Sequence, residues 1–181
     1  MKKILLGTII FLFFMGSLFS DQSIFDENLC APNEDIVCSF KMKNSTKTLS
    51  ILIAKDYSYI VYRFGTKDNV ELEFPQSKID SWKKFTLYAD SYFRLGVNYR
   101  LSFINCNTRY DILDESFSDG RYDNHKVGVR IINNGTNTQT TLEGVYESKI
   151  GDLDFLDKRM YLDQSRYSNF RMLEVIDIWH E

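Results

Sequence analysis

The residues that could do acid–base or nucleophilic chemistry are few and form no recognisable motif. Two histidines occur, His125 and the penultimate His180. A Ser-His-Asp or Cys-His nucleophile would have to be built around His125, but the Gly-x-Ser-x-Gly pattern of many hydrolases is absent from the sequence. We expect His125, in the polar run Asp123–Lys126, to be a solvated loop residue. The sequence predicts no catalytic residue.

Carboxylates gather between residues 111 and 123: Asp111, Asp114, Glu115, Asp119 and Asp123. Calcium takes several oxygen ligands from one flexible loop, but this spacing differs from the twelve-residue calcium loop, and paired Cys or His spacings are missing. We therefore expect no metal and no cofactor. Two carboxylates about 5–9 Å apart in a cleft can hydrolyse a glycoside, so an envelope hydrolase with an unrecognised carboxylate pair is one alternative function.

The elements that must position these residues show a period of two. Alternation is clearest over residues 36–42, 49–53, 70–74, 97–103 and 127–131, with polar turns at 43–47 and 133–137. The spacing of Leu153, Leu156 and Met160 predicts one short helix near residues 152–162, and residues 170–179 could form a closing strand. The pattern predicts an all-β, mainly antiparallel sandwich or barrel of about 8–10 strands.

The first twenty residues resemble an export signal. Lys2 and Lys3 precede the apolar run Ile4–Met15, which is shorter than the ~20 residues that span a bilayer, and small residues follow up to Ser20. We predict a signal peptide at residues 1–20 and a single all-β domain at residues 21–181. The protein is then periplasmic or secreted, with no membrane insertion after the leader is removed.

Composition limits the kinds of partner. The chain has 22 Lys and Arg against 25 Asp and Glu, a formal net charge of −3, and loss of Lys2 and Lys3 with the leader takes it to −5. The charges are interspersed, so no basic stripe is available for nucleic acid or for an anionic membrane surface. We expect neither partner.

The stretch Tyr57–Phe64 is apolar or aromatic on both faces of the predicted strand. Tyr57, Tyr59, Val61 and Arg63 would share one face, and Ile60, Tyr62 and Phe64 the other. The stretch is a central strand covered on both sides, or one aromatic face lines a partner site with Arg63 as its polar contact. The candidate recognition residues are Tyr59, Tyr62, Arg63 and Trp82, although Trp82, in a polar loop, could instead cap a sheet edge.

Several short blocks between residues 29 and 75 carry a resemblance: Cys30, Glu34 to Ser39, Lys47–Ser50, Tyr62–Gly65 and Glu71–Pro75. Over this quarter of its length the chain resembles a mostly uncharacterised family of small exported Gram-negative bacterial proteins. The resemblance implies a compartment and a fold type, not a reaction.

The resemblance also bears on the three cysteines, Cys30, Cys38 and Cys106. Similar sequences carry a further cysteine where this chain has Ile51-Leu52, so the resemblance implies that Cys38 is a buried thiol without a bridge. Cys30 and Cys106 are then the candidate disulfide. Two registers are possible for the strand that contains Cys38. The alternation of apolar residues places Cys38 on the same face as Ile51 and Ile53, whereas a hairpin closed by the 43–47 turn places it near position 52.

Together these features predict an exported, non-enzymatic binding protein that recognises another protein in the periplasm. An acidic binder suits a basic target, because opposite charge speeds encounter. An inhibitor of a cell-wall hydrolase or an immunity-type protein is the concrete form of this hypothesis. Two alternatives to a protein-binding function remain. One is the hydrolase described above, and the other is a β-barrel that holds a small ligand in an aromatic-lined cavity.

Overall fold

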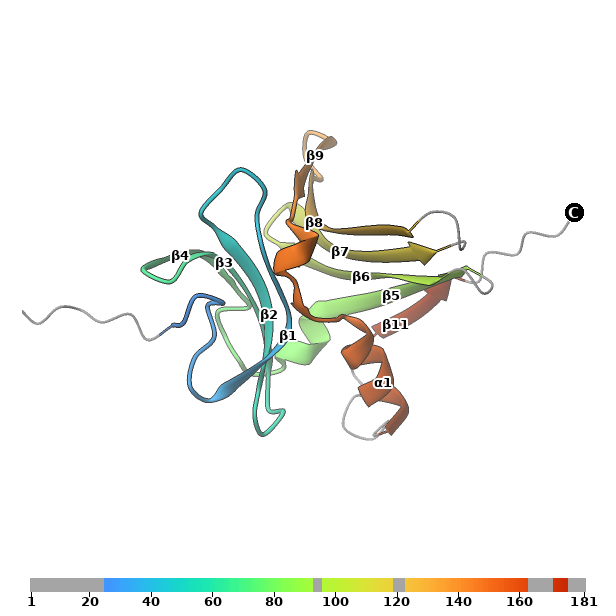
Figure 1. Ribbon diagram of the computed structural model, residues 1–181. Coiled ribbons are helices and arrows are strands. Elements are labelled where there is room, and N and C mark those ends of the chain that lie inside the picture. Colours follow the sequence, from blue (N-terminus) through green and yellow to red (C-terminus); the bar gives the residue numbers. More distant parts are fainter. Residues whose placement is uncertain (1–24, 93–95, 119–122, 163–170, 176–181) are drawn as a thin grey trace, which may run out of the picture.

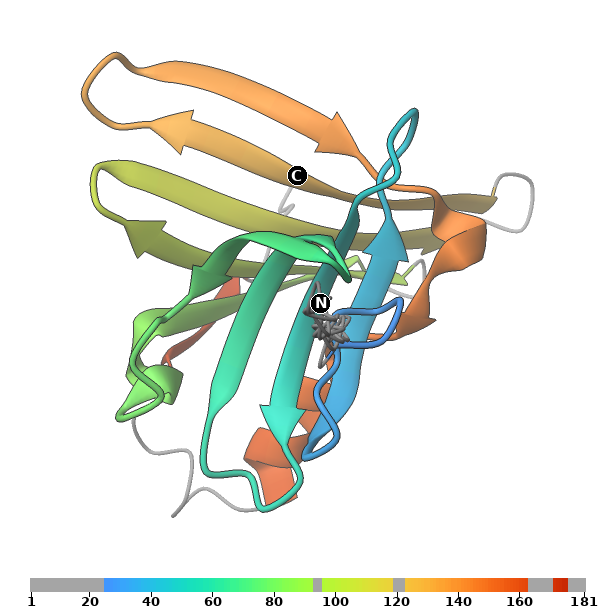
Figure 2. The same ribbon diagram turned by 90° about the vertical axis from the view of Figure 1, so that its left-hand side faces the viewer.

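Two β-sheets pack face to face as a sandwich in this computed structural model, which describes residues 25–92, 96–118, 123–162 and 171–175 (Figure 1). The first sheet has the strand order β10-β1-β2-β3-β4, and the second β11-β5-β6-β7-β8-β9. The strands of the two sheets run across one another (Figure 2). The predicted all-β fold is confirmed, and of its two alternatives the chain adopts the sandwich. The predicted signal peptide at residues 1–20 lies outside the described residues.

The first sheet consists of β1 (Glu34–Lys41), β2 (Thr48–Ala54), β3 (Ile60–Thr66), β4 (Asn69–Phe74) and β10 (Ile150–Gly151). The second consists of β5 (Phe85–Tyr92), β6 (Gly96–Asn105), β7 (Thr108–Ser118), β8 (Asp123–Asn133), β9 (Thr138–Glu143) and β11 (Arg171–Val175). Two 3-10 helices, η1 (Ser81–Lys84) and η2 (Tyr146–Ser148), and the α-helix α1 (Asp154–Leu162) complete the described elements. Helix α1 confirms the helix expected near residues 152–162. Strand β11, which is parallel to β5, lies within the predicted closing stretch 170–179, whose other residues are outside the described ranges.

The first hairpin forms as its turn residues predict. Met42 donates its N–H to the carbonyl of Lys47 at 2.9 Å, and Asn44 takes the left-handed φ of 56° that this turn requires. A register shift between Ile36 and Cys38 then sets Cys38 opposite Ile51. This is one of the two neighbours that alternation allowed, and it places the Cys38 thiol in the core between the sheets.

An aromatic cluster fills the interior where β3 and β4 cross β5, β6 and β7. Phe103 lies at its centre, with ring centroids 4.3 Å from Phe74, 4.9 Å from Tyr62, 4.9 Å from Tyr110 and 5.5 Å from Phe85. Offset and edge-on aromatic contacts at these distances stabilise a core beyond the area they bury. The rings therefore occupy the space between the sheets.

The outer face of the first sheet is covered by the irregular segment 25–33. Leu29 of this segment is fully buried, as are Leu52 and Val61 on the outward side of β2 and β3. Beneath it, the hydroxyl of Ser50 donates to the carbonyl of Asn28 at 2.6 Å. The strand β3 is therefore covered on both faces, as one of the two interpretations of residues 57–64 predicted.

A buried lysine ties the C-terminal part of the chain to the second sheet. Lys149 pairs with Asp114 of β7 at 2.6 Å and with Asp152 at 2.5 Å, and Asp114 also accepts the N–H of Leu153 at 3.0 Å. Burial alone would lower the pKa of Lys149, but its hydrogen bonds to the two carboxylates outweigh this and raise the pKa. The segment that leads into α1 is held in place by these contacts.

Candidate functional site

Arg63, expected as a surface contact, is buried under the segment 25–33. Its side chain is 4% exposed, and its guanidinium pairs with Glu34 and, through Nε, with Glu73 at 2.6 Å. It also donates to the carbonyl of Leu29 at 2.9 Å, and the ring of Phe25 lies 4.5 Å from its central carbon. A side chain enclosed in this way cannot contact a partner, so the prediction of Arg63 as a recognition residue is corrected.

Glu34 is the centre of this polar network. Burial alone would raise the pKa of Glu34, but hydrogen bonds from Arg63, from the N–H of Ala31 and from Tyr59 hold it below its usual value. The hydroxyl of Tyr59 donates to Glu34 at 2.9 Å and accepts from Asn33 at 3.2 Å. Tyr59 therefore fastens the segment 25–33 to the sheet, although part of its ring remains exposed.

The other two predicted recognition residues are also explained by packing. Tyr62 is 2% exposed and belongs to the aromatic cluster, so it offers no surface to a partner. Trp82 is half-buried in η1, packs against the core and donates its indole N–H to the carbonyl of Tyr57 at 3.1 Å. Packing against the core therefore accounts for the position of Trp82 in this loop.

The predicted Cys30–Cys106 disulfide is wrong, because all three cysteines are free thiols. Cys30 precedes β1 of the first sheet and donates its thiol to the carbonyl of Glu34 at 3.4 Å. Cys106 is exposed in the turn between β6 and β7 of the second sheet. The pair therefore belongs to opposite sheets, whereas Cys38 is buried and unbridged as expected.

We expect a thiol reagent such as Ellman's reagent to distinguish the three cysteines. Burial, together with the charges of Asp26 and Glu34, raises the pKa of Cys30 from an ordinary value of 9.0 to about 11. Its thiolate is then about a hundredfold scarcer near neutral pH than that of an ordinary thiol, and it should react correspondingly more slowly. Exposed Cys106 should react first and Cys38 only on unfolding. A Cys106→Ser variant should lose the fast phase, and rapid modification of Cys38 would contradict the buried position.

His125 lies on β8, exposed, and not in a loop as predicted. Its ring stacks on Tyr146 at 4.9 Å, and its Nδ1 lies 3.1 Å from the hydroxyl of Ser116. A Ser-His nucleophile needs a third group that orients the ring and donors for the oxyanion. Among the described residues the ring is held by stacking and by the serine, so this pair alone does not define a catalytic site.

Asp111 and Asp114 of the acidic run are neutralised by the chain's own cations. Asp111 is buried and accepts from Ser102 at 2.7 Å and from Arg130 at 3.2 Å, while Asp114 holds Lys149. In the described part of the chain no group of three or more His, Cys, Asp or Glu could hold a metal ion. Within the same residues, no helix is long and apolar enough to cross a membrane.

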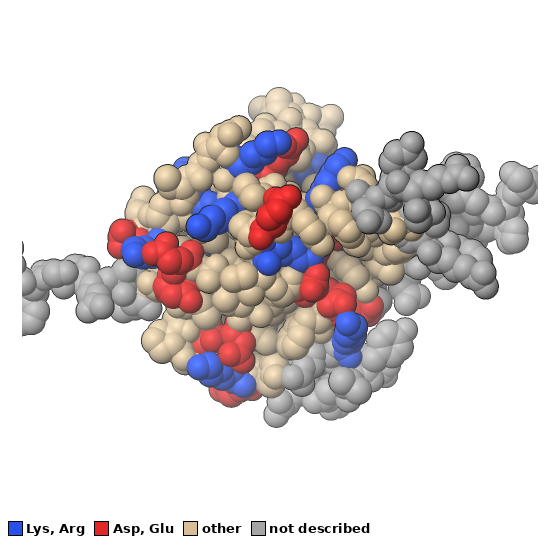
Figure 3. Space-filling view, viewed as in Figure 1, with Lys and Arg blue, Asp and Glu red and all other residues tan. Residues whose placement is uncertain are grey.

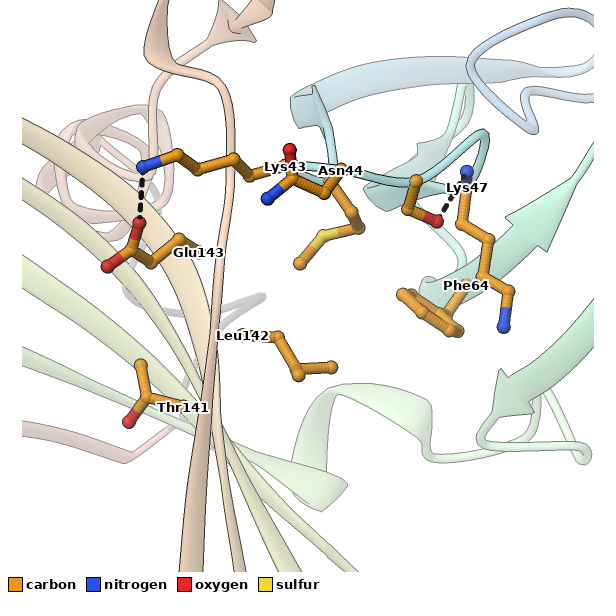
Figure 4. A pocket seen from close by; sticks show the side chains of 9 residues that line it. Lys43, Asn44, Lys47, Phe64, Thr141, Leu142 and Glu143 are labelled. Atoms are coloured by element: carbon orange, nitrogen blue, oxygen red, sulfur yellow. Dashed lines mark hydrogen bonds and ion pairs between the residues drawn. The ribbon is translucent and has the colours of Figure 1, made fainter.

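A groove opens where the β1–β2 turn meets strand β9 (Figure 4). It encloses a volume of about 410 Å³, and Met42, Phe64 and Leu142 form its apolar floor. Phe64 and Leu142 point toward one another across it, and Leu142 is 37% exposed. The polar rim consists of Lys43, Asn44, Ser45, Lys47, Thr141 and Glu143. We call this site the β9 groove.

The charges at the rim of the β9 groove are balanced. Lys43 pairs with Glu143 at 2.8 Å, and Lys47 pairs with Glu71 at 2.8 Å while its amine lies 5.4 Å from the centre of the Phe64 ring. These pairs are exposed and contribute little to stability. On the face of the molecule seen in Figure 3, Lys and Arg are interspersed with Asp and Glu. The groove thus offers an apolar contact surrounded by charges of both signs.

A second, more polar hollow of about 590 Å³ lies beside the β9 groove and shares Lys43, Thr141 and Glu143 with it. Its other lining residues include Glu115, His125, Lys126, Tyr146 and Glu147. Strand β9 pairs with β8 in antiparallel register, with Leu142 opposite Val129. No local pattern predicts the groove, because Lys43 and Glu143 are 100 positions apart in the chain.

Comparison with models of known protein families, with curated protein sequences and with solved structures finds no match to this chain.

Proposed function

We propose that this chain is an exported, non-enzymatic binding protein that recognises another protein through the β9 groove. The observation that carries the proposal is the apolar floor of the groove, where Phe64 and Leu142 are partly exposed and Met42 is buried, beside an exposed edge strand. Apolar contact in a recessed centre, enclosed by a polar rim, is the arrangement from which protein interfaces gain most of their affinity.

The packing of the interior favours a partner bound at the surface over a small ligand bound in a cavity between the sheets. The aromatic strands that would line such a cavity contact each other instead, with Phe103 stacked at 4.3 Å on Phe74 and at 4.9 Å on Tyr110. A groove at the surface, where a backbone edge lies open, is typical of peptide and protein recognition.

Export and charge complete the proposal. The signal-like residues 1–20 and the net charge of −5 without them suit a partner in the periplasm that carries positive charge, such as a basic cell-wall hydrolase or toxin. The chain would then act as its inhibitor or immunity protein.

Replacing Leu142 by glutamate should remove recovery of that partner. A carboxylate on the groove floor would have to be desolvated against Met42 and Phe64, so we expect at least about a tenfold loss of binding. The measurement is affinity capture from a periplasmic extract, followed by titration of the recovered protein. Ile79→Glu is the matched control, because Ile79 is 80% exposed and does not line the β9 groove. Equal recovery by wild type and Leu142→Glu would contradict the proposed site.

A further inference from the structure

A self-contained turn, Asp26–Cys30, lies on the outer face of the first sheet. Its backbone N–H groups are bonded within the turn. The carboxylate of Asp26 accepts the N–H of Asn28 at 2.8 Å and that of Cys30 at 2.9 Å, and the carbonyl of Asp26 accepts the N–H of Leu29 at 3.0 Å. The N–H of Asp26 in return donates to the carbonyl of Cys30 at 3.2 Å. The turn thus keeps its own shape and adds no strand to the sheet. We call it the Asp26 turn.

Side chains of the sheet bind the Asp26 turn by its carbonyl groups. The hydroxyl of Thr48 donates to the turn at 3.2 Å, that of Ser50 at 2.6 Å, and the guanidinium of Arg63 at 2.9 Å. The acceptors are three consecutive carbonyls, those of residues 27–29. Thr48 and Ser50 share one face of β2, and Arg63 lies opposite Ser50 on β3. Because every residue has a carbonyl, these donors bind the backbone of the turn irrespective of its side chains.

The leucine of the Asp26 turn makes the contact that depends on sequence. Leu29 is fully buried. Leu52 of β2 and Val61 of β3 are also fully buried, lie opposite one another, and do not belong to the core between the sheets. Their outward side is the side that the turn covers, where Leu29 is its buried apolar residue. Burial of this side chain adds a preference for leucine to the recognition of the backbone.

The docked turn is strained at this leucine. Leu29 has a left-handed backbone conformation, with a φ of 58°. Glycine and asparagine adopt this conformation readily, whereas it is unfavourable for leucine. Strain of this kind persists where the surrounding contacts impose it, and it is found at binding sites and switch regions. Here the contacts are the burial of the leucine side chain and the bond from Arg63. Release of the turn from the sheet would remove the strain.

The Asp26 turn can separate from the sheet without disrupting the sandwich. Within the described residues it is joined to the fold at one end, through residues 31–33, which lead into β1. On its outer side Glu27 pairs with Lys67, and these side chains are 73% and 44% exposed, so the pair contributes little to stability. Because the turn belongs to neither sheet, its release breaks no pairing between strands.

We propose that the outer face of the first sheet is a recognition site for a peptide turn of the pattern Asp-x-x-Leu, which the Asp26 turn occupies until a turn of a partner protein replaces it. The resident turn defines the ligand: an aspartate that bonds the turn's own N–H groups, three carbonyls directed at the sheet, and a leucine. Arg63 reaches such a ligand only after the Asp26 turn has left, so it is not a surface contact of the structure described above. The site shares no residue with the β9 groove and does not depend on the function proposed for that groove.

The resident turn competes with any ligand, because it is tethered to the site. A short tether gives an effective concentration in the millimolar range. A free peptide should therefore bind weakly to the wild type and more tightly once the resident turn has been displaced. Leu29→Asp displaces the turn, because a carboxylate would otherwise be buried where the leucine now lies.

The test is a titration of a fluorescent synthetic peptide with the sequence of residues 24–32 against the purified chain, followed by fluorescence anisotropy. We expect the Leu29→Asp variant to bind this peptide at least about tenfold more tightly than the wild type. The same peptide with aspartate in place of its leucine should bind at least about tenfold less tightly. Ile104→Glu is the control, because Ile104 is 56% exposed on the second sheet, and this variant should bind the peptide as the wild type does.

A further variant tests the recognition of the carbonyl groups. Thr48→Val keeps the size of the side chain and removes its hydroxyl donor. Combined with Leu29→Asp, it should weaken peptide binding by about fivefold. Simple adhesion of the leucine to an apolar surface would leave the affinity unchanged, which would contradict the proposed recognition. Circular dichroism checks that the variants keep the strand content of the wild type. Leu29→Ala is a milder displacing variant, and its affinity for the peptide should lie between those of the wild type and Leu29→Asp.

Hydrogen exchange in the wild type tests the release of the turn without any substitution. The N–H groups of Leu29 and Cys30 should exchange at least about a hundredfold faster than those of Leu52 and Ile53 in β2, because local opening of the turn does not require the whole protein to unfold.

Four results would overturn the proposal. Equal affinity of the wild type and Leu29→Asp for the peptide would show that the resident turn does not block the site. No binding to folded Leu29→Asp would show that the face accepts the turn only as part of its own chain. Exchange at Leu29 as slow as in β2 would show that the turn opens only on global unfolding. A wild-type dimer that dissociates in Leu29→Asp would place the turn of a second copy on this face.

Discussion

Replacing Arg63 by methionine is expected to lower the free energy of unfolding by about 3–5 kcal/mol. The reason is the burial of its partners: Glu34 has a side chain 1% exposed and would lose the cation that compensates its charge. Removing one member of a buried ion pair leaves an uncompensated charge, which costs far more than the pair contributes while intact. The loss should be seen in urea denaturation followed by circular dichroism.

An exposed ion pair of the same segment provides the control. Lys67 pairs with Glu27 at 2.6 Å, and the two side chains are 44% and 73% exposed. Lys67→Met should change the free energy of unfolding by less than about 1 kcal/mol, because exposed pairs contribute little. Similar losses for Arg63→Met and Lys67→Met would contradict the role assigned to burial.

The pH dependence of stability gives a second measurement of the same network. Burial pushes the pKa of Glu34 upward, but the hydrogen bonds from Arg63, Ala31 and Tyr59 bring the pKa below its ordinary value of 4.5. A lowered folded-state pKa contributes stability that is present above pH 4.5 and lost as the pH falls through the folded value. The difference between wild type and Arg63→Met should therefore shrink below pH 4.5.

Replacing Phe103 by alanine should cost about 3–5 kcal/mol of unfolding free energy. Phe103 is 2% exposed, and its ring contacts those of Tyr62, Phe74, Phe85 and Tyr110. A cavity in the middle of this cluster cannot collapse easily, because both sheets fix the surrounding rings. Chemical denaturation gives the value, and near-ultraviolet circular dichroism should report the change in the environment of Tyr62 and Tyr110.

The neighbouring residue supplies the comparison for Phe103. Ile104 is 56% exposed and points to the other face of β6, so Ile104→Ala should change stability by about 0.5 kcal/mol or less. If Phe103→Ala lowered the free energy of unfolding as little as Ile104→Ala, the aromatic cluster would not be a main source of the core's stability.

Local patterns predicted the hairpins well. The turn 43–47 and the alternation on either side of it predicted the hairpin but left Cys38 opposite Ile51, Ile53 or a position near 52. The register shift between Ile36 and Cys38, which places Cys38 opposite Ile51, has no signal in the alternation. The beginning of β3 was predicted too early. Tyr57 has a φ of 60°, in a turn where Asp56 accepts the N–H of Ser58 at 3.0 Å, so the aromatic alternation of residues 57–59 does not form a strand.

The position of Arg63 and the β9 groove could not be predicted from local patterns. What buries Arg63 is the segment 25–33, which has no regular period and reaches Arg63 through the carbonyl of Leu29, 34 positions earlier. The groove joins a turn near residue 43 to a strand near residue 143. Both depend on contacts between distant parts of the chain, which periodicity does not describe.

The placement of β10 and β11 has a consequence for biosynthesis. Strand β10 pairs with β1, and β11 pairs with β5, so the late part of the chain completes both sheets. The chain is synthesised from its N-terminus, so one edge of β1 and one edge of β5 stay unpaired until residues 150–175 have been made. Closing such long loops has an entropic cost before the new contacts compensate it. Folding therefore finishes only after these last strands have been made, and a chain that ends before them would leave both sheets incomplete.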